Sequence, residues 1–137
     1  MNNVLLNTSF EFAKTFSEND VNVFAGISED KNPIHLDEEY ASKSIFGKRV
    51  VHGILLISMF SKIFGTIYPG EGGIYLSQSV KFTKPVFLDE EIIAKVTLTN
   101  FDSSKMQGIF TTNCYNSKGD IVIAGEAKVL FPARFKL

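Results

Sequence analysis

The sequence predicts an α+β fold in which one long apolar helix is wrapped by a curved antiparallel sheet. Two observations lead to this prediction. Residues 54–67 carry apolar side chains around most of a helix, and residues 74–131 alternate between apolar and polar side chains in stretches divided by short turns. The chain has 137 residues, 45% of them hydrophobic, and no repeat or linker divides it, which is typical of a single domain over residues 1–137.

The first part of the chain predicts a short strand and a capped helix. Aromatic residues in the stretch 10–13 favour a strand. Ser17 and Asp20 have the spacing of a capping box, in which each side chain bonds the other residue's backbone N–H at the start of a helix. We expect this helix to end near Ser28.

A polar segment and a second, short helix follow. Residues 29–37 are predicted to form an ordered loop, because Pro33 disfavours helical geometry at Asn32. A short helix is expected at about residues 37–44, and Gly47 ends it. The loop is therefore held between two helices.

The long helix is expected to follow the segment Val51-His52-Gly53 and to end near residues 68–70. Its apolar side chains leave only a narrow stripe of small or polar residues at helical spacing. A helix that is apolar on most sides is buried, so we infer that the sheet wraps around it. The stripe comprises Ser58, Ser61, Lys62, Gly65 and Thr66.

Four further strands are predicted in the rest of the chain, at residues 74–82, 92–99, 106–115 and 121–131. The last two are divided by a strong turn signal at residues 116–120. Consecutive strands joined by short turns favour antiparallel pairing. Gln78 interrupts the apolar face of the first of these strands, either as a lining residue of an internal tunnel or as a partner of a buried backbone group.

The charge balance argues against nucleic acid or an anionic membrane as the main partner. Lys and Arg number 14 against 15 Asp and Glu, the net charge is −1, and the basic residues are scattered. The first eight residues lack a charged and then apolar leader, and the long helix is interrupted by polar residues. We therefore expect a soluble, cytoplasmic protein with a small-molecule partner, and its one cysteine, Cys114, is expected in a strand.

The strongest chemical signal is in the constrained loop. Asp30 and His35 are five residues apart with Pro33 stiffening the turn between them, so both side chains can reach one small molecule or water. A carboxylate and an imidazole with pKa values near neutrality suit proton transfer. On residue types alone, the interpretation that we favour is the structural one, with Asp30 as a turn cap and His35 as a loop histidine.

A second signal stands where the long helix begins. The unpaired N–H groups of a helix's first turn stabilise negative charge, and a glycine there lets a ligand approach the backbone. Gly53 can thus polarise a carbonyl, or it can simply permit a sharp turn into the helix. Asp30, His35 and His52 are conceivable metal ligands, but no further ligand stands at a usual spacing, so no metal is expected.

Together these motifs resemble those of the MaoC-type hot dog hydratases, and most nearly the (R)-specific enoyl-CoA hydratases that link fatty acid β-oxidation to polyhydroxyalkanoate synthesis. The resemblance covers roughly residues 10–131. The motifs that carry it are Asp30-x-Asn32-Pro33-x-His35, Val51-His52-Gly53, the strand at residues 73–82 and Lys84-Pro85-Val86. It implies a hot dog fold and a homodimer whose two sheets join.

The resemblance also implies roles for particular residues. It makes Asp30 and His35 the catalytic dyad, and it gives the backbone N–H of Gly53 to the thioester carbonyl. Ser58 and Ser61 are candidates for positions near the catalytic water. Asn32 either orients the loop, which we favour, or contacts the surroundings of that water.

The implied reaction is the reversible hydration of a trans-2-enoyl-CoA to the (R)-3-hydroxyacyl-CoA, with no metal or redox cofactor. One alternative is a 3-hydroxyacyl-thioester dehydratase acting on acyl carrier protein substrates. The two would differ at the rim of the site, where Lys48, Arg49, Lys81 or Lys84 would meet CoA phosphates or an acidic carrier protein. Two further alternatives are a hot dog thioesterase and a catalytically silent acyl-binding module.

Overall fold

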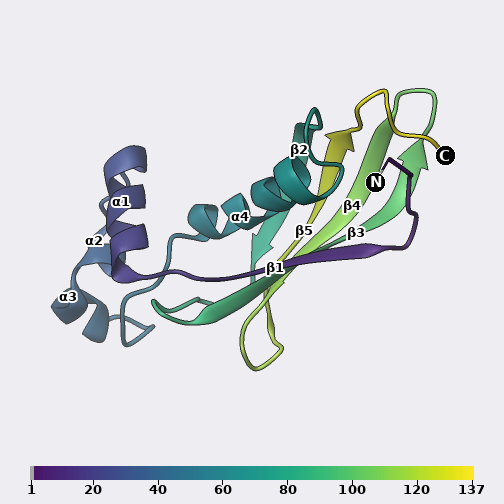
Figure 1. Ribbon diagram of the computed structural model, residues 1–137. Helices are drawn as coiled ribbons and strands as arrows, with labels where there is room; N and C mark the ends of the chain where they lie inside the picture. Colours follow the sequence, from purple (N-terminus) through teal and green to yellow (C-terminus); the bar gives the residue numbers. More distant parts are fainter. Residues whose placement is uncertain (1) are drawn as a thin grey trace.

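The computed structural model describes residues 2–137, so Met1, which falls within the predicted domain, lies outside the described residues. A single five-stranded antiparallel sheet has the order β1-β3-β4-β5-β2, and α4 lies along its concave face while α1, α2 and α3 gather at one end (Figure 1). The elements are β1 (Ser9–Thr15), α1 (Glu18–Ser28), α2 (Pro33–Leu36), α3 (Glu38–Ser42), α4 (Gly53–Lys62), the π-helix η1 (Ile63–Ile67), β2 (Ile74–Phe82), β3 (Glu91–Asp102), β4 (Gln107–Tyr115) and β5 (Ile121–Leu130).

The predicted α+β arrangement is confirmed. α4 and η1 bury five side chains in the same apolar core as the inward faces of the strands: Leu56, Met59, Phe60, Ile63 and Phe64. The predicted small and polar stripe is exposed along its whole length. The helix is wrapped on one side, and its narrow polar side stays in solvent.

The long helix differs from the prediction in its last turns. After Lys62 the backbone widens to a π-helix, in which the N–H of Tyr68 bonds the carbonyl of Ile63 at 2.8 Å. Such wider turns interrupt α-helices locally, and they are not marked by a change in apolar spacing. The helix thus ends at Tyr68 as expected, by a different hydrogen-bond pattern.

The capping box is confirmed. Ser17 Oγ accepts from the Asp20 N–H at 3.2 Å, and Asp20 Oδ2 accepts from the Ser17 N–H at 2.9 Å. These bonds satisfy donors that the first turn of α1 leaves free. They fix where α1 starts, and α1 ends at Ser28, as predicted.

The segment at residues 29–37 is not only a loop, which corrects the prediction. Asn32 does have non-helical backbone angles, φ −54 and ψ 125, as expected before a proline. However, Pro33 itself opens the one-turn helix α2, because proline fits the first position of a helix. Asn32 Oδ1 caps that turn by accepting from the Ile34 N–H at 3.3 Å.

Of the two alternatives for Gln78, the structure shows polar contacts, one of them to a backbone group. Its amide donates to the backbone oxygen of Ser79 at 2.7 Å and to Thr112 Oγ1 at 2.8 Å, and its side-chain oxygen accepts from the Tyr75 hydroxyl. A Cβ on Gly125 would collide with the same Ser79 oxygen, so glycine allows β2 and β5 to pair closely there.

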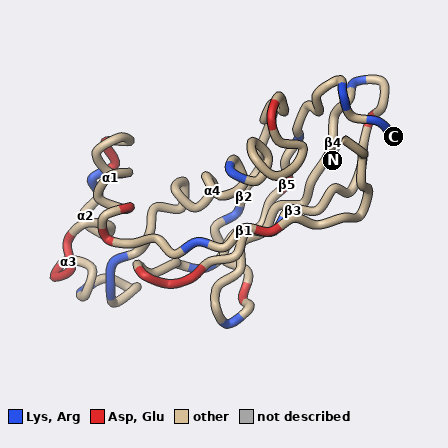
Figure 2. The backbone as a smooth tube through the Cα atoms, viewed as in Figure 1, with Lys and Arg blue, Asp and Glu red and all other residues tan. Residues whose placement is uncertain are grey.

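Charges of both signs are distributed over the helices and the strands (Figure 2).

Cys114 is fully buried in β4, and burial raises the pKa of its thiol to about 12. Within residues 2–137, the longest apolar helix falls short of what crossing a membrane would require.

Candidate active site

The loop between α1 and α2 fixes Asp30 through hydrogen bonds to residues two positions away. The Asp30 N–H donates to Ser28 Oγ at 3.1 Å, and Asp30 Oδ1 accepts from the Asn32 N–H at 3.2 Å. Such local bonds are typical of aspartate in turns. The carboxylate itself is 48% exposed, so its second oxygen is free to meet a ligand.

His35 lies in the last turn of α2 with one ring nitrogen committed. Its Nδ1 is 2.8 Å from the carbonyl oxygen of Val50. Because a carbonyl only accepts, Nδ1 carries the proton, and the lone pair of the neutral ring lies on Nε2. Nε2 is 3.9 Å from Asp30 Oδ2, which is too long for a direct bond and suits a bridging water.

The surroundings of His35 favour its neutral form. Burial lowers the pKa of His35 below its ordinary value of 6.5. The bond to Val50 and the charge of Asp30 raise the pKa of His35, whereas the nearby His52 lowers it further. The ring is therefore an acceptor at Nε2 around neutral pH.

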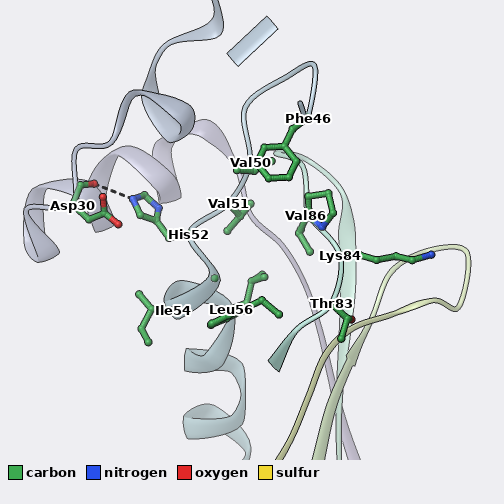
Figure 3. Close-up of a pocket in the computed structure, with 13 residues that line it drawn as sticks. Asp30, Phe46, Val50, Val51, His52, Ile54, Leu56, Thr83, Lys84 and Val86 are labelled. Atoms are coloured by element: carbon green, nitrogen blue, oxygen red, sulfur yellow. Dashed lines mark hydrogen bonds between the residues drawn. The ribbon is translucent and has the colours of Figure 1, made fainter. Parts of the chain in front are cut away.

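His52 joins these two residues, and the sequence analysis missed this role. Its ring is buried and stacks on the ring of His35, with centroids 3.8 Å apart and an interplanar angle of 24°. Its Nε2 is 3.0 Å from the backbone oxygen of Asp30, the contact dashed in Figure 3. The signal in the sequence was that the chain has two histidines and both stand in the motifs.

Asp30, His35 and His52 offer ligand atoms that lie within 4.8 Å of one another, so these are the residues that could hold a metal ion. The Nδ1 of His35 and the Nε2 of His52 both face carbonyl oxygens. A cation held by His52 Nε2 would have to break its bond to Asp30. That no metal is bound stays a prediction.

Arg49 is not a rim residue, which corrects the expectation that it meets a ligand phosphate. It is buried, and its Nε donates to the backbone oxygen of His35 at 2.7 Å. Its Nη1 donates to Glu18 Oε1 at 2.7 Å and its Nη2 to Asn22 Oδ1 at 3.4 Å. Arg49 thus ties the peptide of His35 to α1.

We expect Arg49→Met to lower the free energy of unfolding by about 1–3 kcal/mol, because it leaves the partly buried carbonyl of His35 without its donor. Urea unfolding followed by circular dichroism measures this. The matched control is Glu18→Gln, which keeps the acceptor oxygen at an exposed position and should cost less than about 1 kcal/mol. Equal midpoints for wild type and Arg49→Met would contradict the assigned role.

A cavity of about 480 Å³ opens beside Asp30 and His52, and most of its lining is apolar (Figure 3). Asp30, His52 and the first residues of α4 supply polar groups at its wall. Such a mostly apolar cavity with a few polar groups is typical of a small-molecule site. The lining residues are Asp30, Phe46, Val50, Val51, His52, Gly53, Ile54, Leu56, Phe82, Thr83, Lys84, Pro85 and Val86.

Gly53 is the first residue of α4 and lines this cavity. A Cβ at this position would lie 2.6 Å from a ring carbon of Phe82, so only glycine allows the ring to pack there. His52, the preceding residue, makes no side-chain capping bond to α4 in the described chain. The Leu55 N–H bonds the carbonyl of His52 at 3.0 Å, whereas the N–H groups of Gly53 and Ile54 have no partner among residues 2–137 and are left for a ligand.

Ser58 and Ser61 do not lie with the other predicted residues. Both are exposed on the polar stripe of α4, and neither lines the cavity. The Ser58 hydroxyl donates to the carbonyl of Leu55 at 2.6 Å. Ser61 stands eight residues beyond Gly53, about 12 Å along the helix. Their part in positioning water stays a prediction, while Asn32 has the loop-orienting contact that we favoured.

A central helix wrapped by a curved antiparallel sheet defines a hot dog fold, and here an Asp-His pair lies at the start of that helix. The chain belongs to the MaoC-like family: the family model described as MaoC like domain matches residues 4–119.

Similar proteins agree with this assignment. The chain is 44% identical over 126 residues to an (R)-specific enoyl-CoA hydratase of Rhodospirillum rubrum, covering 92% of this chain and 87% of the relative. It is 38% identical to a mitochondrial 3-hydroxyacyl-[acyl-carrier-protein] dehydratase of Arabidopsis thaliana, covering 87% and 72%. The solved (R)-hydratase from Aeromonas caviae, involved in polyhydroxyalkanoate (PHA) biosynthesis, superposes with a TM-score of 0.92 at 38% identity, covering 94% of this chain and 98% of the other.

Proposed function

We propose that this protein is an (R)-specific enoyl-CoA hydratase, a hydro-lyase that adds water reversibly to trans-2-enoyl-CoA. The observation that carries the proposal is the 3.9 Å separation of Asp30 Oδ2 and His35 Nε2 beside a mostly apolar cavity. The likeness to the (R)-specific hydratases supports the substrate and the stereochemistry. The reaction proposed here uses no metal or redox cofactor.

Both members of the pair accept hydrogen bonds in the resting enzyme. Neutral His35 presents a lone pair at Nε2, and the Asp30 carboxylate is acceptor-only. A water between them donates one hydrogen to each and turns its own lone pair outward, toward the β-carbon of the substrate. As the new C–O bond forms, Asp30 takes one proton from the water. Asp30 then gives that proton to the α-carbon and returns to its carboxylate form, so the H and OH of one water are added across the double bond.

The negative charge of the transition state develops on the thioester oxygen. We assign its stabilisation to the backbone N–H of Gly53, which stands at the positive end of α4. In comparable sites, removal of one such donor costs about 2.7–4 kcal/mol. This interaction strengthens as charge develops, so it lowers the barrier to reaction more than it favours substrate binding.

We expect Gly53→Ala to lower kcat/KM by roughly 10- to 100-fold, because the Cβ must displace the Phe82 ring or shift the N–H from the oxygen. Steady-state kinetics with crotonyl-CoA measures this. Gly65→Ala is the matched control, since a Cβ at Gly65 meets no atom within 4 Å. A fully active Gly53→Ala would argue against a close contact between the substrate and this backbone.

The proposed function is tested by the absorbance of the enoyl-thioester band with crotonyl-CoA, followed by chiral analysis of the product. Loss of the band with formation of (R)-3-hydroxybutyryl-CoA is the expected result. Formation of the (S)-product, or release of free thiol by a thioesterase reaction, would refute it. A protein that is inactive toward short, medium and long enoyl-CoA would leave the carrier-protein dehydratase described next, and an acyl-binding role only if carrier-protein substrates also failed.

A dehydratase acting on acyl carrier protein substrates is the second candidate. The likeness to the Arabidopsis thaliana dehydratase favours it. Lys84 lines the cavity and pairs with Asp120 at 3.1 Å. Its basic group at the rim suits a phosphate of CoA as well as an acidic carrier protein, so it does not separate the two candidates. The ratio of kcat/KM for crotonyl-CoA to that for crotonyl-acyl carrier protein separates the two, and a ratio above one supports the hydratase.

We also propose a single-domain, cytoplasmic homodimer. Among residues 2–137, the edge strand β2 pairs with another strand on one side only, and it exposes Ile74 and Leu76. Pairing of two β2 strands would join the sheets and cover these side chains. Sedimentation equilibrium should give twice the 15.2 kDa chain mass.

A further inference from the structure

We propose that His52 is a positioning residue that holds Asp30 and His35 in register, one through a hydrogen bond and the other through ring stacking. The inference rests on the proposed function, because it assigns His52 to the reaction of that pair. His52 touches both residues of the pair from the N-cap position of α4, the helix whose first N–H we assign to the thioester oxygen. His52 thus contacts Asp30 and His35 and also directly precedes Gly53, whose N–H is the third group of the proposed site.

The bond to Asp30 involves the backbone, not the carboxylate. His52 Nε2 is 3.0 Å from the Asp30 carbonyl oxygen, which can only accept, so Nε2 carries the proton. Figure 3 shows the imidazole directed at this oxygen, with the carboxylate beside it on the same side of Asp30. The bond therefore restrains the Asp30 backbone and leaves the carboxylate free to accept from water.

The stack with His35 fixes the other half of the pair. The two rings are nearly parallel, with centroids 3.8 Å apart, and Phe24 packs edge-on against His52 at 4.9 Å. His35 is already tied at Nδ1 to the carbonyl of Val50. With one edge bonded and one face covered, the ring keeps Nε2 directed toward Asp30.

Packing alone does not account for an imidazole at this position. His52 Nδ1 is fully buried and has no hydrogen-bond partner among residues 2–137. Burying an unpaired polar atom is unfavourable, and a phenyl ring would fill the space without that cost. A glutamine would supply the donor but not the flat ring. Histidine combines the stacking surface with an N–H aimed at Asp30, in a ring small enough for this buried position.

Two variants separate these contributions. His52→Phe keeps a flat ring over His35 and removes the donor to Asp30, while His52→Gln keeps an N–H of similar reach and removes the ring. We expect each to lower kcat for crotonyl-CoA at least tenfold, with a smaller change in KM. Val96→Ala, a buried substitution in β3, controls for general loss of stability.

A second readout does not depend on activity. Imidazole ¹H–¹⁵N NMR titration of the free protein reports the tautomer and the pKa of His35. In wild type the pKa is expected below 6.5, His52→Phe should preserve this, and His52→Gln should raise it toward 6.5 because His35 loses its cover. The acid limb of kcat/KM should move with it.

The outcomes are distinguishable. Wild-type kcat in either variant, or a loss of kcat no greater than the loss of folded protein, overturns the inference. An unchanged His35 pKa in His52→Gln also overturns it, even if the wild type is an active hydratase. If the wild type hydrates no enoyl thioester, the proposed function fails, and the NMR titration still decides whether His52 holds His35.

Discussion

Asp30→Asn is expected to lower kcat for crotonyl-CoA by about 10²- to 10⁴-fold, the range typical of losing a general base. The amide oxygen can still accept from the Asn32 N–H, as Oδ1 does at 3.2 Å in wild type, so the loop keeps its turn. A neutral amide cannot take a proton from water. Loss of the enoyl-thioester absorbance, measured at saturating substrate, gives kcat directly.

The matched control for this prediction is Asp37→Asn. Asp37 also caps a turn, since its Oδ1 accepts from the Tyr40 N–H at 3.0 Å, but it lies outside the cavity. Its replacement should leave kcat within about twofold. An Asp30→Asn enzyme that retains most of its activity, with the same circular dichroism spectrum as wild type, would transfer the role of base to another group.

His35→Asn is the second substitution with a large expected effect. The asparagine amide can donate to the carbonyl of Val50 from a place close to that of Nδ1, but nothing replaces the lone pair at Nε2. We expect a 10²- to 10⁴-fold loss of kcat. Because both residues act on one water, the double variant with Asp30→Asn should lose little more than the weaker single variant. Multiplied losses would mean that the two act on separate steps.

The pH dependence follows from the same ring. Since burial lowers the pKa of His35, the acid limb of kcat/KM should lie below pH 6.5 and should vanish in His35→Asn. The free energy of unfolding should also decrease as the pH falls. The unfolded chain, with the higher pKa, binds the proton first as the pH falls, so the stability contribution of His35 is present above pH 6.5 and is lost below it. Urea midpoints at several pH values test this.

Local chemistry made much of the fold predictable. The capping box at Ser17 and Asp20 depends on residues three apart, and strand alternation depends on residues two apart, so both can be read along the chain. The pairing of Asp30 with His35 rested on the motif, and the structure brings them together as expected. The widening of the long helix into η1 leaves apolar spacing intact and so gave no sign.

Contacts between distant residues explain what was missed. Arginine is usually exposed, and the burial of Arg49 depends on contacts with residues distant in sequence, the carbonyl of His35 and the carboxylate of Glu18, 31 positions earlier. His52 lies 22 positions from Asp30, and its bond depends on how α4 meets the loop. One-turn helix α2 buries no side chain, so no apolar pattern marked it, and its existence depends on the cap at Asn32.

The arrangement of α1, α2 and α3 beyond the end of α4 has a consequence for how the molecule opens (Figure 1). These helices bury few side chains, Val21 and Ala25 in α1 and Ala41 in α3, whereas β3 and β4 lie within the core. Elements with little buried surface unfold separately at low free-energy cost. Amide hydrogens of residues 18–47 should exchange with solvent long before those of the central strands, and heating should abolish turnover while the sheet is still intact.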